Sequence, residues 1–214
     1  EVRGGGEVTP HLGSRAYFAD ACAPGTYDHT QYLALKLLGK TLRYTTDLSG
    51  AKCGCNAALY LTAMRQNTNR TKCLDFYCDA YGGCGSRCVE IDIQEANQHS
   101  WHSTLHAKGD QGGVGLGYGG GGATWSGPRD WTAAEYSPGS ACVNTSAPFD
   151  VAVSFPVDGA GALRAVEVTL TQAGRRCPLH ASVTRYPGMA ELSRALAAGM
   201  TPVVSYWSSA DMLW

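Results

Sequence analysis

The clearest alternation of apolar and polar positions lies in the second half of the chain. Every second side chain of residues 149–155 is apolar, and residues 166–170 repeat the pattern after an Asp158-Gly159 turn. This alternation is typical of half-buried strands, and the turn predicts that the two strands pair as a hairpin. Residues 189–198 instead space their apolar side chains as a helix does, and Gly199 suits the C-terminal end of that helix.

Other segments complete a chain dominated by strands. Further strands are predicted at residues 15–18, 57–64, 89–95 and 202–207. Residues 32–44 suit either a helix or a strand, and the β-branched and aromatic residues that follow favour a strand. The glycine-dominated residues 108–130 predict a long loop. We therefore expect one all-β domain over residues 1–214, a sandwich of two antiparallel sheets with one short helix.

Composition and charge narrow the possible partners. Charged residues make up 16% of the chain, and the formal net charge is −1. No basic patch points to nucleic acid and no apolar run is long enough to span a membrane, so we expect neither partner, and we expect a monomer. The 27 Gly, 11 Tyr and 5 Trp residues suit a turn-rich β protein with aromatic surfaces, on which sugar rings stack.

The cysteines favour disulfides over a metal site. They are Cys22, Cys53, Cys55, Cys73, Cys78, Cys84, Cys88, Cys142 and Cys177. Nine is a high count for a cytosolic protein, and no Cys-x2-Cys pair suggests zinc. An odd number leaves one cysteine unpaired or paired outside this chain. Two glycosylation triplets, beginning at Asn69 and Asn144, also fit an extracellular, secreted protein.

The segment from Cys88 to Asn97 is the most informative for chemistry. Glu90 and Asp92 are two residues apart and share one strand face, while Val89, Ile91 and Ile93 point to the core. Glu95 would point to the opposite face of a regular strand, but one β-bulge between Asp92 and Glu95 returns it to the face of Glu90.

Such a bulge could place two carboxyls roughly 5–5.5 Å apart, the separation that retaining glycosidases need. The nucleophile must then stay ionised, while burial and nearby negative charge raise the pKa of its partner. The alternative is an exposed acidic face on an edge strand.

Histidines and tryptophans give weaker signals. His99, His102 and His106 could hold a metal, but without further ligands of clear spacing ordinary polar histidines are favoured, and we expect no cofactor. Any of the tryptophans could line a sugar cleft, although a core position or a loop anchor is favoured for each. These are Trp101, Trp125, Trp131 and Trp207, the last of which lies in an apolar run and is predicted to be core.

Several segments, in order, resemble glycoside hydrolase family 7, the cellobiohydrolases and endoglucanases. They are GSRAYFA (13–19), CGCNAALYL (53–61), EIDIQEAN (90–97), AAGMTPVVSYW (197–207) and DMLW (211–214). The resemblance implies a β-jelly-roll fold, a β-glucan polysaccharide as substrate and no cofactor. It covers roughly the central half of that family's domain, which fits a truncated or minimal member.

The resemblance also implies roles for individual residues. Glu90 is expected to be the nucleophile, Asp92 its positioning partner and Glu95 the acid/base. The resemblance further implies contacts with the nucleophile or the sugar. Tyr17 and Tyr60 are expected to make them, His106 is expected to assist near the leaving-group side, and Trp214 is expected to be a stacking platform on the non-reducing side.

Departures from the family pattern leave alternatives open. Gln94 stands where the family has a tryptophan, and Arg65 and Gln66 replace acidic residues. Long loops that roof a tunnel have no counterpart, which favours an open cleft and internal cleavage of a β-1,4-glucan. The family's partner for the cysteine matching Cys53 would lie beyond residue 214. A family 16 enzyme cutting β-1,3 or mixed linkages, or a non-catalytic glucan-binding or wall-matrix protein, are the alternatives.

Overall fold

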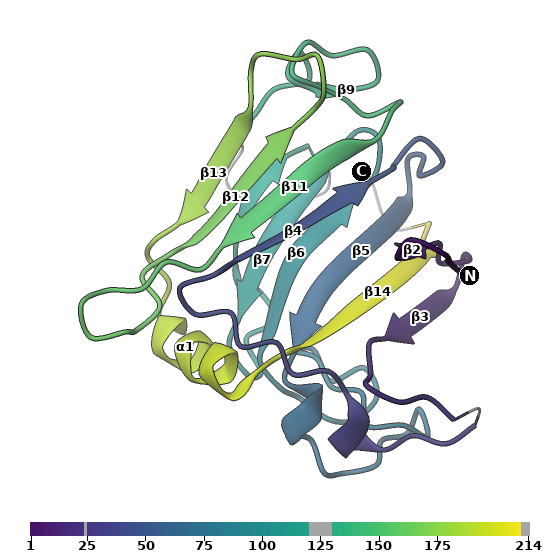
Figure 1. Cartoon of the computed structure of the whole chain (residues 1–214), viewed down its shortest axis with the longest axis vertical. Coiled ribbons are helices and arrows are strands. Elements are labelled where there is room, and N and C mark those ends of the chain that lie inside the picture. The colour runs from purple at the N-terminus through teal and green to yellow at the C-terminus, as the bar shows by residue number, and fades with distance from the viewer. Residues whose placement is uncertain (24, 120–129, 211–214) are drawn as a thin grey trace.

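Two antiparallel sheets lie face to face in the computed structural model, which describes residues 1–23, 25–119 and 130–210 (Figure 1). The larger sheet contains, in spatial order, β3 (Ser14–Tyr17), β14 (Thr201–Ser208), β5 (Cys55–Thr62), β6 (Glu90–Ala96), β7 (Trp101–His106) and β8 (Val114–Tyr118). The smaller sheet contains β13 (Leu179–Val183), β12 (Val166–Thr171), β11 (Phe149–Ser154) and β4 (Thr41–Thr46). The predicted all-β sandwich is confirmed.

Shorter elements complete the described fold. They are β1 (Val2–Arg3), β2 (Glu7–Val8), β9 (Tyr136–Ser137), β10 (Val143–Asn144), the 3-10 turns η1 (His29–Gln31) and η2 (Met64–Gln66), and the helix α1 (Met189–Ala198). No helix in the described part of the chain is long and apolar enough to cross a membrane.

The core between the sheets follows from the strand alternation. Val151 and Val153 on β11 point inward and are buried, as are Ile91 and Ile93 on β6. Trp101 on β7 is buried among the same group of side chains. Burying a side chain of this size stabilises the fold by roughly 1.5–3 kcal/mol, so the alternation fixes which face of each strand is left for function.

The helix α1 has the predicted bounds. Leu192 and Leu196 lie on its buried face. Gly199 ends it with φ of 101°, and a Cβ at this position would lie 2.8 Å from the Cβ of Ala34. A larger residue would therefore be strained and crowded at once, which explains why the helix stops at a glycine.

One strand prediction and one loop prediction need correction. In the segment 32–44 only Thr41 onward forms a strand, because residues 32–40 cross toward α1 and make only two isolated bridges, Tyr32 with Ala19 and Leu35 with Met200. The segment 108–130, predicted as a loop, contains β8. Its glycines permit close packing against β7, since a Cβ at Gly117 would lie 1.9 Å from the carbonyl oxygen of Trp101.

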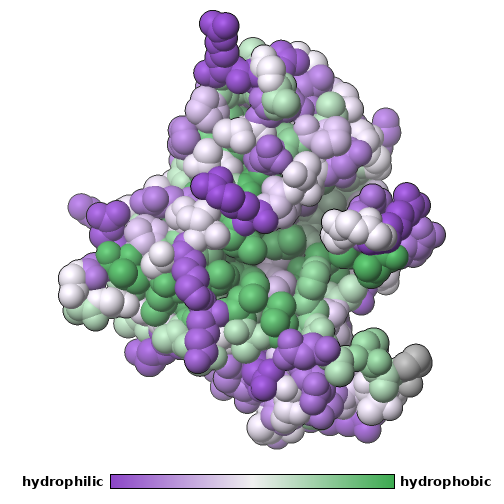
Figure 2. Space-filling view, viewed as in Figure 1, coloured by the Kyte–Doolittle hydropathy of each residue, from purple (hydrophilic) through white to green (hydrophobic). Residues whose placement is uncertain are grey.

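The smaller sheet covers only part of the larger one. β4 is its edge strand, and on the inner face of β5 and β14 the side chains of Leu59, Val204 and Tyr206 remain partly exposed. Figure 2 shows apolar side chains gathered around a hollow on this side of the molecule. The other face of the larger sheet, away from this hollow, carries the acidic residues.

Three disulfides confirm the predicted oxidised state of the cysteines. They are Cys73–Cys84, Cys78–Cys88 and Cys142–Cys177. Three cysteines rather than one are unpaired, namely Cys22, Cys53 and Cys55. The first two disulfides lie in the segment 67–89 between η2 and β6, which we call the cysteine-rich loop. They fix this loop beside the start of β6.

Candidate active site

The acidic strand β6 contains a bulge at the predicted place. On β5, Tyr60 pairs with Asp92 and Leu59 pairs with Gln94, so Ile93 has no partner of its own. The pairing of β6 with β7 also shifts between Asp92 and Glu95. A bulge adds one residue to one strand and thereby reverses the facing of the residues that follow.

The bulge brings all three carboxyls to one face of the sheet. Glu90 pairs with Thr62, and Glu95 pairs with Ala58, while Asp92 lies opposite Tyr60. Since these partners are two residues apart on a regular strand, they share a face, and so do the acids paired with them. The face is open to solvent at Glu90 and Glu95, which are partly exposed, whereas Asp92 is buried. We call it the acidic face.

Asp92 forms a buried ion pair with His106. The Nε2 atom of His106 lies 3.1 Å from Asp92 Oδ2, and its Nδ1 atom lies 2.8 Å from the carbonyl oxygen of Asp110. Both partners are acceptors, so both ring nitrogens carry protons and the ring is an imidazolium. Burial alone would lower the pKa of His106, but the hydrogen bond and charge of Asp92 outweigh it and raise the pKa to about 9.

Glu95 accepts a hydrogen bond from Asn56, a fully buried residue on β5. The distance from Asn56 Nδ2 to Glu95 Oε1 is 2.8 Å. Burial, followed by the negative charge of Asp92, raises the pKa of Glu95 to about 8, while Asn56 and His106 act in the opposite direction. Glu95 is therefore set to hold a proton near neutral pH.

Glu90 is held from the cysteine-rich loop. The backbone N–H of Ala80 donates to Glu90 Oε2 at 2.9 Å. Burial and the charge of Asp92 raise the pKa of Glu90, the Ala80 N–H lowers it, and the charges of Asp79 and Glu95 raise it further. A backbone N–H can only donate, so this contact favours the ionised carboxylate.

Tyr60 and Tyr17 lie at different distances from the acids. The hydroxyl of Tyr60 is 3.1 Å from the hydroxyl of Tyr77 in the cysteine-rich loop. Tyr17 is on the edge strand β3, separated from β6 by β14 and β5. At about 4.8 Å per strand, Tyr17 is about 14 Å from β6, so it cannot contact Glu90 and can only serve a more distant part of a ligand.

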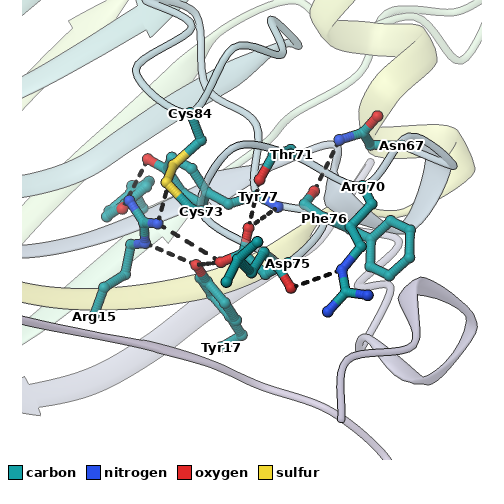
Figure 3. A network of polar contacts seen from close by, with 12 residues as sticks. Arg15, Tyr17, Asn67, Arg70, Thr71, Cys73, Asp75, Phe76, Tyr77 and Cys84 are labelled. Atoms are coloured by element: carbon teal, nitrogen blue, oxygen red, sulfur yellow. Dashed lines mark hydrogen bonds and ion pairs between the residues drawn. A yellow bond between two sulfur atoms is a disulfide. The ribbon is translucent and has the colours of Figure 1, made fainter. Parts of the chain in front are cut away.

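Tyr17 belongs to a polar network at the end of the acidic face (Figure 3). Its hydroxyl donates to Asp75 at 2.6 Å and accepts from Arg15 Nε at 2.8 Å. Asp75 also accepts from the Thr71 hydroxyl at 2.7 Å and from the Tyr77 backbone at 2.9 Å. The ring of Tyr17 stacks on that of Tyr77, with centroids 5.9 Å apart.

The tryptophans divide between the core and the acidic face. Trp101 and Trp131 are buried, as favoured from the sequence. The prediction that Trp207 is core is wrong, because its side chain is 42% exposed. It pairs with Asn56 and so lies on the acidic face. Trp125 and Trp214, the latter predicted to stack on sugar, lie outside the described residues.

Gln94 is turned away from the acidic face. Its amide accepts from the Tyr44 hydroxyl at 3.1 Å and donates to the carbonyl oxygen of Ala57 at 3.0 Å. Both ends of the amide are satisfied between the sheets. Gln94 therefore makes its hydrogen bonds away from the acids and the residues that hold them.

The structure places Glu90, Asp92, Glu95, Tyr60 and His106 together on the acidic face. Four further residues that the sequence did not indicate also face this side, namely Asn56, Trp207, Tyr77 and Arg15. The alternation of faces within β5 and β14 could have predicted this location for Asn56 and Trp207. Asn56 is four residues from Tyr60, and Trp207 is two residues from Ser205, a buried residue of the same face.

The acids lie on an open sheet face rather than in an enclosed cavity. Two cavities of about 320 and 400 Å³ are lined by other residues, around Val89 and Lys108 and around Tyr44 and Thr169 respectively. Within the described ranges no group of three or more His, Cys, Asp or Glu side chains is arranged to hold a metal ion. The arrangement suits acid–base and nucleophilic chemistry on an extended ligand.

Comparisons with known proteins find similar sequences among glycoside hydrolases. Residues 5–75 match Glycosyl hydrolase family 7. Endoglucanase EG-1 of Trichoderma longibrachiatum is 29% identical over 220 residues, which cover 83% of this chain and 44% of that protein. Endo-beta-1,4-glucanase celB of Emericella nidulans is 34% identical over 113 residues, covering 44% of this chain and 26% of that protein.

A solved structure has the same fold. The family 7 cellobiohydrolase from Daphnia pulex superposes with a TM-score of 0.63 at 20% identity, covering 86% of this chain and 60% of that one. The shared architecture is the β-jelly-roll sandwich. The chain spans less than half the length of the endoglucanase EG-1 that it matches.

Proposed function

We propose that this chain, which belongs to glycosyl hydrolase family 7, is a retaining endo-β-1,4-glucanase that hydrolyses cellulose-type β-glucan. The observation that carries the proposal is the bulge of β6, which puts Glu90, Asp92 and Glu95 on one open face. Retaining glycosidases require two carboxyls of the protein beside the same glycosidic bond, one ionised and one protonated.

Glu90 is the proposed nucleophile. Burial and the charge of Asp92 raise the pKa of Glu90 above its usual range, and the Ala80 N–H opposes this rise by donating to the carboxylate. Its partly exposed side chain is free to face a bound sugar. Attack by this carboxylate would form a covalent glycosyl-enzyme and release the leaving sugar.

Glu95 is the proposed acid/base. Because burial and the charge of Asp92 raise its pKa to about 8, it holds the proton that the leaving oxygen needs. After the leaving group departs, the same carboxyl is ionised and can take a proton from the water that hydrolyses the glycosyl-enzyme.

Asn56 can serve both protonation states of Glu95. Its Nδ2 donates to the carboxylate, while its Oδ1 is buried without a partner. Amide oxygen and nitrogen are assigned from hydrogen bonding, so a turned amide would accept from a protonated Glu95. One buried side chain thus supports the acid and the base forms in turn.

Asp92 and His106 are proposed to control charge rather than to react. Their ion pair keeps one negative charge between the two glutamates while balancing it with an imidazolium. Without His106 the acidic face would carry a further uncompensated charge, and the glutamates would both bind protons more tightly.

The experiment compares Glu90→Gln and Glu95→Gln with the matched control Glu167→Gln, which lies on β12 of the other sheet. Hydrolysis of carboxymethylcellulose should fall by roughly 10³-fold or more for Glu90→Gln and by roughly 10²–10⁴-fold for Glu95→Gln, and remain for the control. Proton NMR of the first products should show the β-anomer.

Other outcomes would point to other functions. A first product in the α-form would exclude the double displacement. Cleavage of laminarin in preference to carboxymethylcellulose would indicate a β-1,3-glucanase. Glucan binding by the wild type without any turnover would indicate a non-catalytic binding protein.

A further inference from the structure

Arg15 lies on the acidic face, at the opposite end from the glutamates. On β3 it pairs with Ser205 of β14, which pairs with Ala58 of β5. Ala58 in turn pairs with Glu95. The acidic face thus carries a second cation besides the imidazolium of His106, and this one lies away from the acids among aromatic side chains.

Contacts with aromatic rings, together with one long ion pair to Asp75, fix the position of the Arg15 guanidinium. Its central carbon lies 3.4 Å from the centroid of the Tyr77 ring, and its Nε donates to the Tyr17 hydroxyl. The nearest carboxylate, Asp75, is 3.8 Å away and already accepts three hydrogen bonds. Removing the guanidinium would therefore leave Asp75 satisfied.

Tyr77 connects this cation to the chemistry. Its hydroxyl lies 3.1 Å from that of Tyr60, whose β5 position is opposite Asp92. Tyr77 is three residues from Ala80, the residue whose N–H holds Glu90. Between them lies Cys78, whose disulfide to Cys88 anchors this part of the cysteine-rich loop.

A cation over an aromatic ring draws electron density from it and makes its hydroxyl a stronger donor. Either hydroxyl of the Tyr60–Tyr77 pair can donate to the other, so this polarisation passes between them, and the position of Tyr60 opposite Asp92 brings it next to β6. Burial raises the pKa of Tyr60 and the charges of Glu90 and Asp92 raise it too, whereas Arg15 lowers it. Tyr60 is thus within electrostatic reach of Arg15 and of both acids.

We propose that Arg15 is a positioning residue for glycosidic cleavage, which acts through Tyr77 and Tyr60 on the nucleophile side of the site without touching the sugar. This inference rests on the proposed function. It gives a role in that function to Arg15, whose strand is the third from the strand of the acids.

The experiment is a double-mutant cycle with Arg15→Met and Tyr77→Phe on an aryl β-cellobioside, with Arg43→Met as the matched control. Arg43 is an exposed arginine on β4 of the other sheet. The wild type and Arg43→Met must both be active. If neither is, the proposed function fails, and the failure is distinct from that of the present inference.

We expect Arg15→Met to lower kcat by about 10- to 100-fold with KM changed by less than about threefold, because a positional error in a reacting group affects the chemical step. Tyr77→Phe should lower kcat by a similar factor. The double variant should be no worse than either single variant, since both break the same chain of contacts. Arg15→Lys should recover part of the loss.

Three results would overturn the inference. A rise in KM with unchanged kcat would make Arg15 a direct sugar ligand. Additive losses in the double variant would show that Arg15 acts independently of Tyr77. In the third, kcat falls together with the melting temperature and Arg15→Lys does not restore it. Arg15 would then have a role in folding alone.

Discussion

At the scale of single residues, the acidic face both raises the pKa of Glu95 and limits that rise. His106 neutralises Asp92 within an ion pair at 3.1 Å, and Asn56 donates to Glu95 at 2.8 Å. Both contacts limit how far burial can raise the pKa of Glu95, which reaches about 8 rather than a value at which the carboxyl could never ionise. A group that must release and regain a proton in each turnover needs this intermediate setting.

Trp207 provides a test of ligand binding at the same scale. Its side chain is 42% exposed and lies on the acidic face beside Asn56. Replacing Trp207 by Ala should raise KM for soluble cello-oligosaccharides by roughly fivefold with kcat nearly unchanged, because one stacking contact contributes about 1 kcal/mol. Steady-state kinetics would measure it, with Val157→Ala in the β11–β12 loop as control. An unchanged KM would remove Trp207 from the binding surface.

At the scale of elements, the cysteine-rich loop and β6 form the site together. The loop supplies Tyr77 and the Ala80 N–H, while β6 supplies the three acids. Cys78–Cys88 joins the loop to the residue two before Glu90. The disulfide therefore limits how far Tyr77 and Ala80 can move away from Glu90.

Removing that disulfide should affect activity beyond its effect on stability. In the variant with Cys78→Ala and Cys88→Ala, we expect kcat to fall by about tenfold or more at a temperature where the protein is folded. The matched control removes Cys142–Cys177, which closes a longer stretch and lies away from the acids. Removing either disulfide should cost roughly 2–5 kcal/mol of stability, but only the first should lower kcat. Equal losses of kcat in both would contradict the assignment.

At the scale of the whole molecule, several buried groups bind protons more tightly in the folded state. The pKa of Glu95 rises from 4.5 to about 8, and that of His106 from 6.5 to about 9. In each case the folded state holds more protons than the unfolded state between the two values. Stability must then decrease as pH rises through these ranges.

We therefore expect the melting temperature to be highest in mild acid and to fall by several degrees, about 4 °C or more, between pH 5 and pH 9. Calorimetric scans across this range would measure it. Glu95→Gln should flatten the curve mainly below pH 8, and His106→Gln should flatten it between pH 6.5 and 9. A melting temperature that rises over this range would contradict the assigned protonation states.

Much of this architecture could be predicted because its signals are local. The hairpin of β11 and β12 and the helix α1 each follow from a periodic pattern within one segment. The bulge followed from the odd spacing of Glu90 and Glu95, which a regular strand cannot place on one face.

Features that depend on distant neighbours could not be predicted. β8 contains two glycines among five residues, and the reason for Gly117 is visible only against Trp101 of β7. Trp207 lies in an apolar run, and its exposure results from the position of β14 next to the short edge strand β3. The contact of Arg15 with Tyr77 joins two segments that share no sequence pattern.

Because β14 and β5 lie between β3 and β6, the width of the sheet fixes the distance between the residues of β3 and those of β6. Two intervening strands set a span of about 14 Å from the proposed catalytic carboxyls to the tyrosine at the sheet margin, which leaves room for more than one sugar unit. A glucan of only two units would leave the far end of this track empty. Chain length, rather than the identity of any single sugar, then decides how much of the protein a ligand can engage.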